Sequence, residues 1–236
     1  MCSTTLLPRF SANYFFSMRH LLPMVTTAIL VTAASAASKP HVITFGRWTS
    51  VKFLSGQNED QPTEIKVRPL YVDAAQKAYT LGTHHEISDL LLVVQRMLRV
   101  NDSLPSETLA APRWIWRRGG WIVVDRGNGH IAPANLPEFD PDFSKANWYR
   151  DYVAYCGMSE DGRKLYAIVM QLGRRKPVLK KSIGEIKDGD SPECTPPTWQ
   201  RQPARVTFVV KPDQKITYAV HGTAAELSDD DEEGTE

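Results

Sequence analysis

Short runs of β-branched and aromatic residues, separated by turn residues, recur along most of this chain. They return at intervals of about 8–12 residues, a spacing typical of all-β proteins. The runs predict strands at 42–45, 48–54, 64–73, 114–116, 121–125, 152–157, 164–172, 177–181, 205–210 and 215–220. Strands this short and this frequent predict a mainly β fold of antiparallel hairpins, arranged as a β sandwich, a barrel or a partial propeller-like stack.

Turn residues divide the expected strands into hairpins. Gly119 and Gly120 suit a tight hairpin between Trp116 and Trp121, because both glycines tolerate positive φ. Residues 88–100 are less clear, since their apolar side chains fit one face of a helix and also a buried strand. The neighbouring strands favour the strand.

The first 36 residues have the pattern of an N-terminal extension followed by a cleaved signal peptide. Met18-Arg19-His20 forms a basic opening, residues 21–31 are largely apolar, and Ala34-Ser35-Ala36 matches a cleavage site. The apolar run is shorter than the roughly 20 residues that span a bilayer, so we expect no stable membrane insertion. Met1 and Met18 both remain candidate initiators, and the apolar start could instead be a core segment. The pattern predicts a periplasmic or secreted protein.

The opposite end of the chain is acidic. Six acidic residues and no basic residue lie between 228 and 236, which predicts a solvated, disordered tail rather than a calcium loop. The expected organisation is therefore an extension and leader at 1–36, a single β-rich domain at 37–225 and an acidic tail at 226–236. The body between leader and tail carries a net charge of about +5, too mild a bias to predict nucleic-acid binding.

Two cysteines remain once the leader is removed, Cys156 and Cys194. In an oxidising compartment two cysteines suggest one disulfide. The bridge would close a loop of roughly 38 residues and contribute about 3–4 kcal/mol in the chain-entropy model. Cys156 lies in an apolar run, so a buried free thiol is the alternative, and no neighbouring base predicts a catalytic thiolate.

Tryptophan and arginine residues are concentrated between residues 113 and 150. The candidate binding residues are Trp114, Trp116, Arg118, Trp121, Trp148 and Arg150. Trp114 and Trp116 share parity on a strand, so an exposed face there would stack on a sugar or a partner peptide. The same pattern also fits a core face capped by snorkelling arginines.

Acidic residues and histidines form two further groups. Four acids lie close together at Glu138, Asp140, Asp142 and Asp151. On an extended segment the first three would share one side and could bind a cation or help to hydrolyse a glycoside, but Pro137 and Pro141 favour a loop. His84 and His85 point to opposite faces of a strand, which disfavours a metal site. The sequence predicts no catalytic residue, no metal site and no cofactor.

Residues 173–181 hold five basic side chains. Such a segment could attract an acidic polymer, but it more often protects a sheet edge from pairing with another chain. We expect the edge role.

Two local resemblances add to this pattern. Trp121-Ile-Val-Val-Asp125 with Gly127 and Gly129, and the turn at 159–166, resemble hairpins of TolB-like β-propeller blades. The chain has strands for two or three blades, fewer than a closed propeller needs, so a partial stack, a dimer, a sandwich or a barrel remains open. Residues 113–181 also resemble an uncharacterised family of exported bacterial proteins. The strings that carry this second resemblance are Arg118-Gly-Gly-Trp121, Leu136-Pro-Glu-Phe-Asp140, Trp148-Tyr-Arg-Asp-Tyr152 with Cys156-Gly157, and Gln171-Leu-Gly-Arg-Arg-Lys-Pro177. That family implies export and brings no activity.

The sequence as a whole favours a non-catalytic exported protein that binds or scaffolds another component of the cell envelope. The expected partner is an envelope protein or a glycan. The alternative is an extracytoplasmic hydrolase that acts on carbohydrate or peptide through the acids of residues 138–151.

Overall fold

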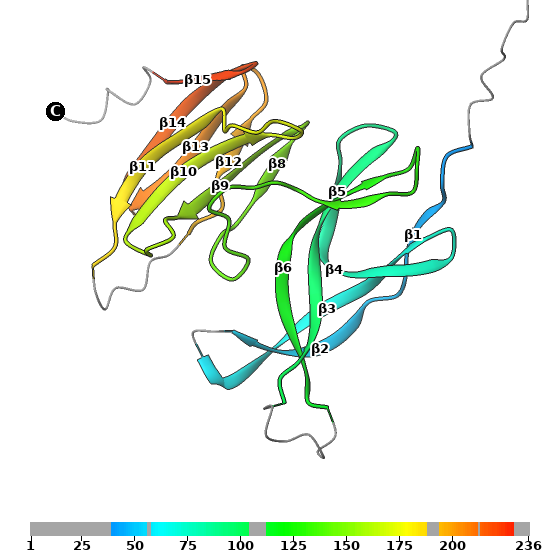
Figure 1. Ribbon diagram of the computed structural model, residues 1–236. Coiled ribbons are helices and arrows are strands. Elements are labelled where there is room, and N and C mark those ends of the chain that lie inside the picture. Colours follow the sequence, from blue (N-terminus) through cyan, green and yellow to red (C-terminus); the bar gives the residue numbers. More distant parts are fainter. Residues whose placement is uncertain (1–38, 56–57, 104–111, 188–193, 212, 229–236) are drawn as a thin grey trace, which may run out of the picture. The chain divides into compact units, whose positions relative to one another are not determined.

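The computed structural model describes residues 39–55, 58–103, 112–187, 194–211 and 213–228, and these residues form strands and no helix (Figure 1). This confirms the prediction of a mainly β fold. Residues from Ser38 onward belong to one compact unit. The expected leader at 1–36 and the acids from residue 229 onward lie outside the described residues.

The first sheet contains seven strands. They are β1 (Ile43–Phe45), β2 (Thr49–Ser55), β3 (Asn58–Val72), β4 (Ala75–Glu86), β5 (Leu91–Asn101), β6 (Trp114–Asp125) and β7 (Ile131–Pro133). Strands β2 to β6 pair in sequence order, each antiparallel to the next. Five alternating strands leave the first and last running in the same direction, so β6 meets β2 in a parallel pairing at Phe53 and Trp116.

Strand β6 corrects one prediction, because the chain runs straight through the expected hairpin at Gly119-Gly120. Gln95 pairs with Trp121 and Met97 pairs with Arg118, so β6 has two residues where β5 has only Arg96. This is a β-bulge. A Cβ atom on Gly119 would lie 3.1 Å from the Arg96 carbonyl oxygen. The missing side chain therefore allows β5 and β6 to approach closely, and the glycine does not form a turn.

Strand β5 is buried on both faces in its first half, where Leu92, Val93 and Val94 are all buried in succession. Leu92 and Val94 pack with residues of the same sheet, whereas Val93 joins a second cluster that contains Trp148 of β8 and Val153 of β9. The preference for a strand at residues 88–100 is therefore confirmed, and its unbroken apolar run reflects burial on both sides.

Two further sheets have four strands each. The first contains β8 (Asn147–Tyr149), β9 (Tyr152–Met158), β10 (Lys164–Gln171) and β11 (Leu179–Glu185), and the second contains β12 (Thr198–Gln200), β13 (Arg205–Lys211), β14 (Gln214–His221) and β15 (Ala224–Leu227). Each is an antiparallel meander in which neighbours in sequence are neighbours in the sheet. Strand β15 crosses the domain boundary expected at residue 225, and Ser228 after it is buried.

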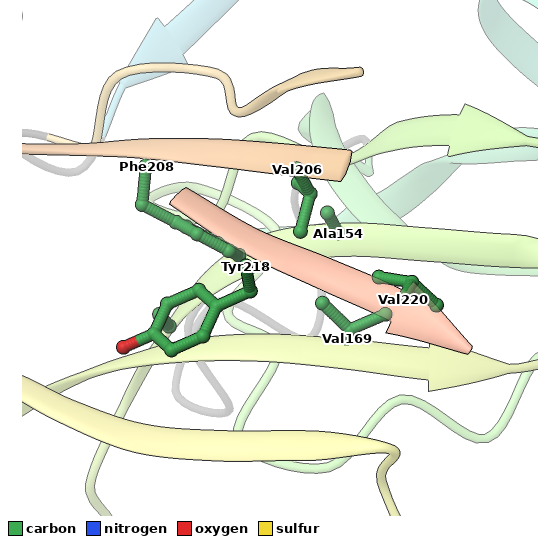
Figure 2. Close-up of a cluster of buried hydrophobic side chains, with 7 residues drawn as sticks. Ala154, Val169, Val206, Phe208, Tyr218 and Val220 are labelled. Atoms are coloured by element: carbon green, nitrogen blue, oxygen red, sulfur yellow. The ribbon is translucent and has the colours of Figure 1, made fainter. Parts of the chain in front are cut away.

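The two four-stranded sheets pack face to face as a sandwich. In Figure 2, Ala154 and Val169 of one sheet point toward Val206, Phe208 and Tyr218 of the other, and all belong to one buried cluster. A disulfide joins Cys156 in β9 to Cys194 in the segment that leads to β12, which confirms the predicted pairing over the free thiol.

Strand β11 forms one edge of its sheet and carries Lys180 and Lys181. Its cationic side chains therefore occupy the edge position expected for residues 173–181.

Candidate functional site: a cationic cleft beside the bulge of β6

A cleft of about 230 Å³ lies beside the bulge of β6. Its walls come from three strands of the seven-stranded sheet, from the loop at 141–146 and from the segment after Cys194. The lining residues are Leu81, Gln95, Arg118, Trp121, Pro141, Ser144, Lys145, Ala146 and Pro196. Two of them, Arg118 and Trp121, are among the binding residues that the sequence predicted.

The bulge explains why Arg118 and Trp121 reach the same cleft. Residues three positions apart on a regular strand point to opposite faces. Here Arg118 lies opposite Met97 and Trp121 lies opposite Gln95, and these two partners are two residues apart on β5. Directly opposed residues share a face of the sheet, so the extra residue in β6 turns both side chains to the same side.

Two cations line this cleft, Arg118 and Lys145. Burial lowers the pKa of the Lys145 amine, the charge of Arg118 lowers it further, and the charge of Asp142 partly opposes both effects. The Arg118 guanidinium carbon lies 4.9 Å from the centre of the Phe53 ring, which is buried beneath it. The cleft is therefore a partly dehydrated site with an excess of positive charge.

Two N–H donors at the cleft have no hydrogen-bond acceptor. They are Nε of Arg118 and Nε1 of Trp121, and both atoms are buried. A buried donor without a partner costs about 1–3 kcal/mol, and more when the group is charged. Trp148 Nε1 and Arg68 Nε are buried without partners as well, so a ligand-binding site is favoured by the fact that Arg118 and Trp121 line the same cleft.

The remaining predicted residues at this end of the sheet lie behind the cleft. The Trp148 ring is buried, with its centre 5.5 Å from that of Trp121, and the His85 ring stacks on it with a centre-to-centre distance of 6.1 Å. Nε2 of His85 lies 2.8 Å from the Arg150 carbonyl oxygen. The Arg150 side chain itself is exposed and lies over Tyr149, so Trp148 supports the cleft wall while Arg150 lies outside it.

Trp114 and Trp116 lie at the other end of β6 and do not form a common stacking face. Trp114 is 51% exposed and its ring has the Arg99 guanidinium carbon 5.1 Å from its centre. Trp116 is half-buried, with its ring edge-on to Tyr79 in the cluster around Phe53. The core interpretation therefore holds for Trp116, and only Trp114 is open to a partner.

The acids of residues 138–151 do not form a row, because the chain turns at Pro137 and again after Asp140. Glu138 makes an ion pair with Lys180, and Asp140 accepts hydrogen bonds from two backbone N–H groups of its own turn. Asp151 accepts a hydrogen bond from Gln171. The predicted loop is confirmed, and these three carboxylates make contacts that stabilise it and its surroundings.

The histidine pair also separates, as expected for adjacent strand residues. His84 stacks on Phe45 and lies 3.1 Å from a carboxylate oxygen of Glu86, whereas His85 lies on the Trp148 side. Within the described ranges, no three His, Cys, Asp or Glu side chains gather as metal ligands would.

A second cationic–aromatic cluster, which the sequence did not reveal, brings together Phe45, Trp48, Arg68 and His84. The Arg68 guanidinium carbon lies 4.1 Å from the ring centre of Phe45 and 4.5 Å from that of Trp48. Phe45, Arg68 and His84 come from three separate strands and Trp48 lies just before β2, so no common motif links them. Lys145 of the cleft was missed for a similar reason, since a single lysine in a loop carries no signal.

No protein-family model, no curated protein and no solved structure matches this chain. None of the described residues forms a helix of the length and apolarity needed to cross a membrane.

Proposed function

We propose that this chain is a non-catalytic binding protein that works outside the cytoplasm and holds a component of the cell envelope in its cationic cleft. One observation carries the proposal. Arg118 and Lys145 line one cleft of which no described carboxylate forms part, and the adjoining Nε and indole N–H groups lack acceptors. Partly buried cations are costly, and the charge of Asp142 offsets these two only in part, so the arrangement favours a ligand that supplies an anion.

The extracytoplasmic location rests on two features of the chain. The leader pattern at 1–36 is typical of exported proteins, and the Cys156–Cys194 disulfide fits an oxidising compartment. The partner then belongs to the envelope or to the medium outside it.

The hydrolase alternative receives less support. Glycoside hydrolysis uses two carboxyl groups that flank the same bond. Glu138, Asp140 and Asp151 instead make separate contacts with Lys180, with the turn backbone and with Gln171. The cleft presents cations and an indole, which recognise a ligand without cleaving it.

The strand order supports an incomplete propeller-like stack as the scaffold. A propeller blade is a four-stranded antiparallel sheet that packs face to face with the next blade. The sheets β8–β11 and β12–β15 are two such meanders in succession, and their inner faces share one core.

Affinity capture from envelope extracts tests the binding role. The purified protein is immobilised beside an Arg118→Gln/Lys145→Gln variant and an Arg175→Gln/Lys176→Gln control, which removes the same charges from an exposed turn. We expect one reproducible envelope component, eluted intact, on the wild-type and control proteins and little on the cleft variant. Equal capture by the cleft variant, or release of a cleaved product, would contradict the proposal. Circular dichroism confirms that each variant is folded.

A further inference from the structure

We infer that the cleft recognises an oxyanion, a carboxylate or phosphate group, carried on a small polar ligand about the size of one sugar ring. The inference rests on the proposed binding function and specifies the ligand class. The charge, the hydrogen-bond donors and the volume of the cleft support it.

The charge of the cleft favours an anion. Burial lowers the pKa of the Lys145 amine, repulsion by the Arg118 guanidinium lowers it further, and the charge of Asp142 opposes both effects in part. Phe53 lies beneath the guanidinium and keeps water from that side. An oxyanion between the two cations would replace this repulsion with two attractive, charge-assisted interactions.

The unpaired donors show where such an anion would be held. Arg118 Nε and Trp121 Nε1 are N–H groups without acceptors on two residues that line the same cleft. Both nitrogen atoms are covered in this structure, so the two side chains would turn slightly to donate to the oxygens of a carboxylate or phosphate, and neither donor can accept a hydrogen bond in return. A neutral ligand would satisfy the donors but would leave the excess positive charge of the cleft in place.

The other walls suggest what carries the anion. Nε2 of Gln95 donates to the Gly119 carbonyl oxygen at 3.3 Å, which leaves its Oε1 as an acceptor for a ligand hydroxyl. The indole of Trp121 offers an apolar surface for a sugar ring. The volume of about 230 Å³ is below the roughly 300–1,000 Å³ of pockets for drug-sized ligands. The cleft therefore fits one ring or one end group.

Calorimetric titration with three pyranoses tests the inference. D-glucuronate, D-glucose 6-phosphate and D-glucose differ only at C6, which is the carboxylate carbon in the first, bears a phosphate in the second and bears a hydroxyl in the third. We expect both anions to bind at least about tenfold more tightly than glucose, as one charge-assisted hydrogen bond of about 1.5–3 kcal/mol implies. The ratio of the two anion affinities distinguishes carboxylate from phosphate as the favoured group.

Three variants link the binding to the cleft. Arg118→Gln should weaken both anions about tenfold or more, and Trp121→Phe, which keeps a ring but removes the N–H, should weaken them several-fold. The Arg175→Gln/Lys176→Gln control should bind as the wild type does. Trp121→Phe keeps an aromatic ring in the wall, so its effect separates a lost donor from a disturbed fold.

Three results would overturn the inference: glucose binding as tightly as the anions, Arg118→Gln binding as the wild type does, or no anion binding up to about 10 mM. If envelope capture depends on the cleft while no sugar anion binds, the ligand class is wrong and the binding function stands. If sugar anions bind while capture is independent of the cleft, the envelope partner is wrong and the anion site stands.

Discussion

The sandwich of β8–β15 and the seven-stranded sheet of β1–β7 bury their side chains in different ways. In the sandwich each sheet turns one face inward, so β13 alternates between half-buried and buried residues from Arg205 to Phe208. In the seven-stranded sheet β5 is covered on both faces, and a bulge in β6 redirects side chains partway along the strand. The regular region therefore supplies a core, and the irregular region brings cations beside apolar rings and so creates the cleft.

The largest effect should come from the core of the sandwich. Phe208→Ala removes a fully buried ring between its two sheets, and we expect the free energy of unfolding to fall by about 3–5 kcal/mol. Urea unfolding followed by circular dichroism measures the loss. The matched variant is Phe53→Ala in the seven-stranded sheet, where the ring is also buried but lies against Arg118. A loss below about 1 kcal/mol at Phe208 would contradict the described core.

The disulfide should contribute nearly as much to the free energy of unfolding of the same region. It closes a loop between residues 38 positions apart. Replacing both Cys156 and Cys194 with alanine should therefore lower the free energy of unfolding by about 3–4 kcal/mol, because the unfolded chain gains loop entropy. Urea unfolding of wild type with and without reductant gives the same difference independently. An unchanged midpoint under reducing conditions would show that the bridge does not constrain this region.

Two tryptophans on one strand sharpen the contrast within the seven-stranded sheet. Trp116→Ala should destabilise by on the order of 2 kcal/mol, because its half-buried ring packs against Tyr79. Trp114→Ala should change stability by less than about 0.5 kcal/mol, because half of the residue is already exposed. Thermal unfolding of the two variants side by side measures the difference. Equal losses would mean that both rings face the core.

The smallest effect is a pH-dependent one at the surface of the seven-stranded sheet. Hydrogen bonds from Arg126 hold the pKa of Glu86 below its usual range, and nearby His84 adds a weaker effect of the same sign. The stabilisation is therefore complete above the ordinary value of about 4.3 and is lost as the pH falls through the lower folded pKa. Because Glu86 is half exposed, water screening limits the contribution to about 0.5 kcal/mol.

The Glu86→Gln variant tests this dependence. It should be less stable than the wild type at pH 7, and the difference should be smaller at about pH 3, because the stabilisation declines once the pH falls below the ordinary pKa of about 4.3. Urea unfolding at the two pH values measures the difference, and Glu160→Gln, in an exposed turn, serves as the control. A stability difference between the variant and the wild type that grows toward low pH would contradict the predicted pH dependence.

Much of the β fold could be predicted, because apolar runs and polar turns alternate along the chain. The disulfide was also predictable, since Cys156 and Cys194 are the two cysteines that follow residue 36. Strand β4 was missed because the turn before it lacks the residues that usually indicate a hairpin. Asp73 and Ala74 have φ of 48° and 64°, a conformation in which glycine and asparagine are the usual residues. Gly119-Gly120 misled in the opposite way, because glycine serves a bulge as well as a turn.

The cleft could be predicted only in part. Arg118 and Trp121 were predicted because arginine and tryptophan residues are frequent in that segment. The same criterion also gave Trp114, Trp116 and Arg150, which do not line the cleft. Parity along a regular strand would have placed Arg118 and Trp121 on opposite faces, and the bulge reverses that assignment. Lys145 reaches the cleft through a long-range contact, which strand patterns do not encode.

The central claim is that the bulge of β6 holds Arg118 and Trp121 as donors for an oxyanion. The most direct measurement is the indole N–H resonance of Trp121 in nitrogen-15-labelled protein, assigned with Trp121→Phe and followed while D-glucuronate is added. The account predicts that this signal moves with saturation while the exposed Trp114 signal stays in place, and that D-glucose moves neither. A Trp121 resonance that is unchanged by glucuronate, or that moves as far with glucose, would contradict the account.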